Sequence, residues 1–215
     1  MSKDGLHLWQ YSDEDIDRLI NPAIKALFVT NPSNPPSYML SPETMARIVN
    51  IVKEDNPNLM IITDDVYGTF SPHFRSFMAE IPYNTLCVYS FSKYFGATGW
   101  RNAVIALHEY NVFDRQISRL PKEKREALNR RYATLTLHPE KLKFIDRMVA
   151  DSRQIALNHT AGLSLPQQMQ MSLFAAFALL DKENSYQQKM QEIIRRRWPA
   201  VWANSGYTLV EDTLG

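Results

Sequence analysis

Short apolar runs alternate with helix and turn signals along the first half of the chain, and this alternation constrains the fold most. The runs cover residues 26–30, 59–63, 86–90 and 103–107. Runs of this length between turn residues are typical of buried strands. Ser41-Pro42-Glu43 supplies an N-cap, a proline at the first helical position and an early acid, which predicts a helix to about Asp55. A strand, a helix and a second strand form a βαβ unit, so we expect parallel pairing there.

The fourth run follows the third too closely for another parallel connection. A parallel crossover needs about a dozen or more residues, usually as a helix, and the twelve residues 91–102, with two glycines among them, leave too little length for such a helix. The fourth strand is therefore predicted to run antiparallel to its partner. The expected fold class is α/β, with a mixed, mostly parallel sheet, flanking helices and a helical insertion.

The segment after the third run carries the most chemistry. Residues 90–101 read Ser-Phe-Ser-Lys-Tyr-Phe-Gly-Ala-Thr-Gly-Trp-Arg. Lys93 offers an amine able to form an imine, and Ser90 with Arg101 offers a hydroxyl and a guanidinium able to hold a phosphate. A Schiff-base lysine beside a phosphate cradle is what pyridoxal phosphate chemistry requires. The alternative is a surface lysine, with Arg101 in an unrelated ion pair.

Two upstream strand ends carry compatible polar groups. The run at 59–63 leads into Asp64, Asp65 and Tyr67, and the run at 26–30 leads into a proline-stiffened loop with two asparagines. Taken separately, the asparagine loop could be an ordinary turn, and Asp64 and Asp65 could be a helix cap or part of a solvated loop. The carboxyl ends of strands in an open α/β sheet are where ligands bind, so all three ends together favour a ligand site.

The amino-acid sequences of these three segments resemble those of a known family. The Asn-Pro-x-Asn-Pro loop, the Asp-Asp-Val-Tyr strand end and the Ser-Phe-Ser-Lys…Arg segment resemble the aspartate aminotransferase superfamily of fold-type I pyridoxal phosphate enzymes. Within it the loops are most similar to the bacterial aspartate 4-decarboxylases, which also transaminate aspartate. The resemblance implies conversion of L-aspartate to L-alanine and CO2. The alternatives are an aminotransferase of another amino acid and a truncated, catalytically silent binding or regulatory module.

The resemblance also implies which residues bind pyridoxal 5'-phosphate. They are Asn34, Asp64, Tyr67, Ser90, Lys93 and Arg101. Lys93 is the implied catalytic residue, which forms the imine and shuttles protons. Asp64 would face the pyridine nitrogen and keep it protonated, which strengthens the ring as an electron acceptor. Asp65 is the weaker candidate of the acidic pair, and no metal is implied.

The remaining implied roles concern two oxygen sites of the cofactor. Tyr67 and Asn34 would hydrogen-bond the phenolic oxygen of the ring. Ser90 and Arg101 would bind the phosphate, the guanidinium as a charge-assisted clamp.

Two superfamily features are not found in the sequence. The segment Met1 to Ala26 carries no Gly-rich phosphate signal, and the arginine that grips the substrate α-carboxylate would lie beyond Gly215. The chain is therefore expected to be the middle of an enzyme or a truncated reading frame. By itself it is expected to bind the cofactor weakly, with little or no turnover.

The domain organisation is predicted from composition and from the resemblance. Residues 1–110 are expected to form part of the large cofactor-binding domain, 111–155 a charged helical insertion, 156–192 helices returning to the large domain, and 193–215 the start of a C-terminal small domain. The insertion is interpreted as a solvated helical region or a contact with another subunit. Apolar residues of a later helix are predicted to be core: Met169, Met171, Leu173, Phe174 and Phe177.

Composition and charge restrict the classes of partner and the cellular location that we expect. A net charge of +1 gives no electrostatic reason to expect nucleic acid. The single cysteine, Cys87, excludes an intrachain disulfide and is interpreted as a small core residue. The stretch Leu173–Leu180 is shorter than the roughly 20 residues that span a bilayer, and no signal-peptide pattern opens the chain. We expect a cytoplasmic protein, no membrane partner and, from the resemblance, a homo-oligomer.

Overall fold

The computed structural model describes residues 10–34, 36–156 and 164–203. In chain order its main elements are α1 (Asp13–Asp17), β1 (Ala26–Thr30), α2 (Pro42–Asn50), β2 (Met60–Asp64), α3 (Phe77–Glu80), β3 (Thr85–Ser90), β4 (Ala103–Leu107), α4 (Val112–Ser118), α5 (Lys122–Tyr132), α6 (Phe144–Ala156), α7 (Leu165–Leu180) and α8 (Ser185–Trp202). Short helical turns are η1 (Arg18–Ile20), η2 (Ile51–Asp55), η3 (Gly68–Phe70), η4 (Pro82–Asn84), η5 (Thr98–Trp100) and η6 (Pro139–Lys141).

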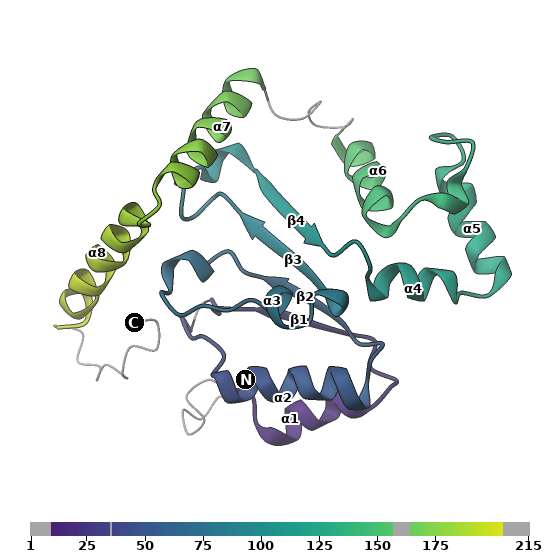
Figure 1. Ribbon diagram of the computed structural model, residues 1–215, viewed down its shortest axis with the longest axis horizontal. Coiled ribbons are helices and arrows are strands. Elements are labelled where there is room, and N and C mark those ends of the chain that lie inside the picture. Colours follow the sequence, from purple (N-terminus) through teal and green to yellow (C-terminus); the bar gives the residue numbers. More distant parts are fainter. Residues whose placement is uncertain (1–9, 35, 157–163, 204–215) are drawn as a thin grey trace.

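The sheet has the predicted topology. Its strand order is β1-β2-β3-β4, with the first two pairings parallel and β3 antiparallel to β4 (Figure 1). Thr30 pairs with Asp64, and Asp64 with Val88. Strand β2 lies one residue later than predicted, because the ladder with β1 continues through Asp64. The carboxyl ends of three parallel strands therefore meet at one edge of the sheet.

One face of the sheet packs on α1, α2 and α3. The Ser41 hydroxyl accepts a hydrogen bond from the Thr44 amide at 3.1 Å, so the predicted N-cap is confirmed. The helix continues as the π-helical η2 and ends at Asp55, as predicted. Apolar residues of these helices and of β1 and β2 form the main core, in which Phe77 and Ile61 are fully buried.

Replacing Phe77 by alanine is expected to lower the free energy of unfolding by about 3–5 kcal/mol, because a fully buried ring leaves a cavity. Urea denaturation of the two proteins measures the difference. Phe28→Ala is the matched control, since the Phe28 ring is 65% exposed and its loss removes little packing. Equal denaturation midpoints for Phe77→Ala and Phe28→Ala would contradict this location of the core.

Among the residues that the structure describes, those that cover the opposite face of the sheet lie mainly at one end. There Leu86 packs with Val112 and Phe113 of α4, and the rings of Phe113 and Phe144 stack with centroids 4.9 Å apart. This contact anchors α4 and α6 to β3. Residues 111–156 are mainly helical, and α4, α5 and α6 group beyond the end of β4 (Figure 1). That this segment is an insertion stays a prediction.

The prediction of core positions in α7 is wrong for most of the residues named. Met169, Leu173 and Phe177 are 59%, 67% and 52% exposed. Helix α7 is apolar around its circumference, but only one edge of it meets the sheet layer within the described chain. At that edge Phe174 stacks on Phe95 and Trp100, with centroids 5.7 and 6.2 Å apart.

Candidate active site at the strand ends

Lys93 lies in the loop that follows β3. This loop is closed by the Thr98 hydroxyl, which donates to the Ser92 carbonyl at 2.7 Å, and by Gly96, whose amide donates to the Lys93 carbonyl. Gly96 has a φ of +65°, a conformation that glycine adopts without strain. The Lys93 side chain is exposed, and its Nζ lies 6.0 Å from the centroid of the Tyr67 ring. The loop thus presents the amine toward the end of β2.

The two asparagines of the Asn-Pro loop have different tasks. Asn34 Nδ2 donates to the Tyr67 hydroxyl oxygen at 2.9 Å. Asn31 is 1% exposed, and its Oδ1 accepts from the Leu40 amide, which fixes the loop after β1. Asn34, Tyr67 and Lys93, predicted as site residues, are therefore brought together from three strand ends.

The adjacent carboxylates at the end of β2 lie on opposite faces, because side chains alternate along a strand. Asp64 is half-buried, and its Oδ1 accepts from the Val66 amide at 3.1 Å, which opens the turn toward Tyr67. Asp65 is 5% exposed and lies in the interior beside Thr63 and Cys87. The structure thus separates an accessible acid from a buried one.

Ser90 and Arg101 bracket the Lys93 loop. The Phe91 amide donates to the Asn102 carbonyl at 3.1 Å, which keeps the two ends of the loop adjacent. The Ser90 hydroxyl oxygen accepts from the Ser92 amide at 3.2 Å. Arg101 is exposed, has a left-handed backbone with φ of 54°, and donates to the Thr98 carbonyl at 3.2 Å. A hydroxyl and a guanidinium therefore stand at the two ends of the loop that carries the amine, although no direct contact joins them in the described part.

An aromatic cluster behind Lys93 was not predicted as part of the site. Tyr94 packs edge-on against Phe70 and Tyr186, with centroids 5.7 and 5.6 Å apart. Burial raises the pKa of Tyr94 to about 12, so it remains a neutral phenol beside the lysine. With the rings of the Lys93 loop and α7 it lines a cavity of about 710 Å³. Five aromatic residues within positions 89–100 were the available signal.

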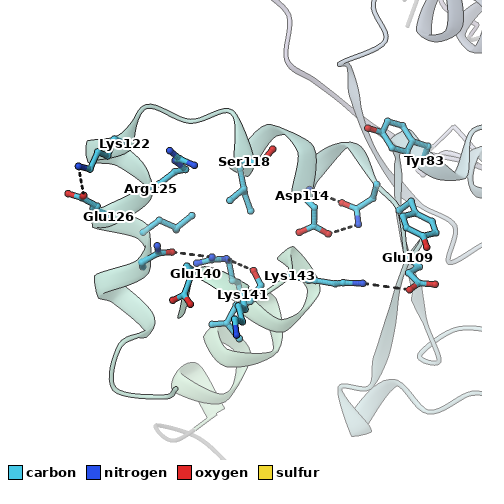
Figure 2. Close-up of a pocket in the computed structure, with 17 residues that line it drawn as sticks. Tyr83, Glu109, Asp114, Ser118, Lys122, Arg125, Glu126, Glu140, Lys141 and Lys143 are labelled. Atoms are coloured by element: carbon cyan, nitrogen blue, oxygen red, sulfur yellow. Dashed lines mark hydrogen bonds and ion pairs between the residues drawn. The ribbon is translucent and has the colours of Figure 1, made fainter. Parts of the chain in front are cut away.

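A cavity of similar size, about 740 Å³, lies among α4, α5 and the segment that precedes α6. Figure 2 shows charged side chains of both signs around it, from α4, α5 and the segment that precedes α6. Two ion pairs lie at its rim, and the charges within each pair cancel: Lys122 with Glu126 at 3.9 Å, and Lys143 with Glu109 at 3.8 Å. None of the predicted site residues lines this cavity, so the candidate site is the edge of the sheet.

The residues that the structure describes contain no group of His, Cys, Asp and Glu side chains arranged to hold a metal ion. They also include no helix with the length and apolar character needed to cross a membrane.

The strand-end arrangement agrees with the comparison with known families. The aminotransferase class I and II family matches residues 7–198. The chain belongs to this family. This match confirms the predicted family resemblance, and it relates the chain to enzymes. Enzymes of this family depend on pyridoxal phosphate.

One relative is similar to this chain in sequence, and two solved structures are similar to it in fold. A bifunctional aspartate aminotransferase and L-aspartate beta-decarboxylase from Pseudomonas is 52% identical over 204 residues, which are 95% of this chain and 38% of that protein. A Thermus thermophilus aspartate aminotransferase mutant has a TM-score of 0.60 at 20% identity, over 96% of this chain and 47% of that one. A Pyrococcus horikoshii aromatic aminotransferase has a TM-score of 0.59 at 21% identity, over 94% and 45%. The chain thus spans under half the length of these relatives.

Proposed function

We propose that the edge of the sheet around Lys93 binds pyridoxal 5'-phosphate, and that the complete enzyme decarboxylates L-aspartate to L-alanine and CO2 while also acting as an aspartate aminotransferase. The observation that carries this proposal is the cluster of Asn34, Tyr67 and Lys93. The cluster joins three strand ends in a chain that is 52% identical to an enzyme with both activities.

The residues present fit this cofactor. The Lys93 amine is exposed, lies beside an aromatic ring, and forms no ion pair within the described chain, so it is free to bind an aldehyde. The Tyr67 oxygen already accepts a hydrogen bond from Asn34, which leaves its own proton to donate to an anionic oxygen. When bound, pyridoxal phosphate supplies an aldehyde for the amino group and a ring that accepts electrons.

Each side chain then has a defined task. Asp64 holds a proton at the ring nitrogen, where a fixed carboxylate stabilises the positive charge. Ser90 and Arg101 hold the phosphate by a hydrogen bond and a charge-assisted contact. Lys93, once released, carries a proton to and from the substrate carbon, because its loop keeps the amine within reach.

The wider organisation is also part of the proposal. We assign residues 1–110 to the large domain, 111–155 to an insertion, 156–192 to the return of the chain and 193–215 to the start of a small domain; residues 1–9, 35, 157–163 and 204–215 lie outside the described structure. The proposed partners are aspartate and further copies of the chain. The proposed location is the cytoplasm.

The experiment is to supply the purified full-length enzyme with pyridoxal phosphate and aspartate labelled with 13C at the β-carboxylate. Labelled CO2 together with one equivalent of alanine is the expected result. Oxaloacetate that forms only when a 2-oxo acid is added would favour an aminotransferase and contradict the decarboxylation. Absence of both products, with no cofactor bound, would favour the silent module for this chain.

A further inference from the structure

The buried carboxylate of Asp65 connects β2 to β3 directly behind the candidate site. Its Oδ1 accepts from the Thr63 hydroxyl at 2.5 Å, and its Oδ2 accepts from the Cys87 thiol at 3.2 Å. Its main-chain amide donates to the Val88 carbonyl, and its carbonyl accepts from the Gly68 amide, both at 2.9 Å. All polar groups of Asp65 thus hold the end of β2 in place.

Cys87 acts as a hydrogen-bond donor in this arrangement. Burial, and then the neighbouring Asp65 carboxylate, raises the pKa of the Cys87 thiol to about 12. The thiol therefore keeps its proton at neutral pH and donates it to Asp65 across the pairing of β2 with β3. This bond ties the strand that carries Asp64 to the strand that leads to Lys93.

A buried carboxylate needs an explanation, since burying a charge destabilises a fold unless partners compensate. Asp65 is 5% exposed and forms no ion pair among the residues the structure describes. An apolar residue would pack there at lower cost. The carboxylate instead satisfies two donors, Thr63 and Cys87. These bonds fix the residue whose main-chain carbonyl closes the turn to Gly68, and this turn contains Tyr67.

We propose that Asp65 is a positioning residue, whose hydrogen bonds to Thr63 and Cys87 fix the turn carrying Asp64 and Tyr67 against the strand that leads to Lys93. Its side chain lies on the face opposite Asp64, so it acts through the main chain and not by touching the cofactor. This inference rests on the proposed function of the site, but its first test does not need the cofactor.

The first test compares amide hydrogen exchange in cofactor-free protein. Asp65→Asn keeps the shape of the side chain but loses one of its two acceptor oxygens. We expect exchange at the Val66 and Gly68 amides to accelerate by about tenfold, the loss of one buried hydrogen bond. The matched control is Ile61→Val, on the same face of the same strand and fully buried. It should leave exchange at these two amides unchanged.

The second test measures the dissociation constant of pyridoxal phosphate from the change in cofactor absorbance. Asp65→Asn should bind about tenfold more weakly, while Ile61→Val should bind as the unmodified protein does. Cys87→Ser keeps a donor to Asp65 and should retain affinity, whereas Cys87→Ala should weaken binding about threefold. Rescue by serine separates the hydrogen bond from simple packing, and this pair suffices if Asp65→Asn does not fold.

Each outcome decides the inference. Unchanged exchange at Val66 and Gly68 in Asp65→Asn would overturn it, as would equal cofactor affinities of Cys87→Ser and Cys87→Ala. Accelerated exchange with unaltered affinity would make Asp65 structural only and would also overturn it. If the unmodified protein binds no pyridoxal phosphate, the proposed function fails, and the exchange measurement alone decides whether Asp65 orders the turn.

Discussion

In the complete enzyme, replacing Lys93 by alanine is expected to abolish covalent attachment of pyridoxal phosphate and to lower turnover of aspartate by at least about 10³-fold. The substitution removes both the imine-forming amine and the positioned proton carrier, and the second loss alone costs about 10²–10⁴-fold. Borohydride reduction followed by peptide mass mapping measures attachment. Labelled CO2 release measures turnover.

The control for this substitution is Lys25→Ala. Lys25 precedes the first residue of β1, at the opposite end of the strand from the candidate site. Its amine donates to the Pro22 carbonyl at the surface. It should retain attachment and activity. A reduced cofactor found on another lysine in the Lys93→Ala protein would show that residue 93 is not the attachment site.

Replacing Asp64 by asparagine is expected to lower turnover by about 10²–10³-fold, because a fixed charge at the ring nitrogen is lost. Asparagine retains an Oδ1 that can accept the Val66 amide, so the turn after β2 should persist. The free energy of unfolding should therefore change by no more than about 0.5 kcal/mol. Steady-state kinetics and urea denaturation of the same preparation separate the two effects.

The matched comparison for Asp64→Asn is the neighbouring Asp65→Asn. The first removes a charge on the cofactor side and the second a charge on the core side of one strand. Asp64→Asn should therefore affect turnover far more than stability. Equal turnover of Asp64→Asn and the unmodified protein would exclude Asp64 from the ring nitrogen.

Local signals explain how much of the fold could be predicted. The cap at Ser41 and the end of η2 at Asp55 are set by residues close in sequence, so the helix was predicted with both ends correct. The antiparallel direction of β4 was predicted from the length of the connection between β3 and β4, because a short connection cannot hold a crossover helix. The three strand ends then had to meet, which brought Asn34, Tyr67 and Lys93 together.

The remaining features depend on contacts between distant segments. Apolar composition predicted burial for α7, but burial needs a second surface, and within the described chain most of this helix meets none. The cluster of Tyr94, Phe70 and Tyr186 joins a loop to α8, which no local pattern specifies. The different settings of Asp64 and Asp65 followed from strand alternation only once the end of β2 was known.

The antiparallel return of β4 has a mechanical consequence for the site. Ser90, Lys93 and Arg101 all belong to one β-hairpin, so a sliding motion of β3 would carry the amine and the groups proposed to bind phosphate as a unit. Asp64 and Tyr67 stay behind on the neighbouring strand. Shear between β2 and β3 is therefore the distortion that would separate the proposed amine from the proposed acid and phenol, and the hydrogen bonds between these two strands oppose it.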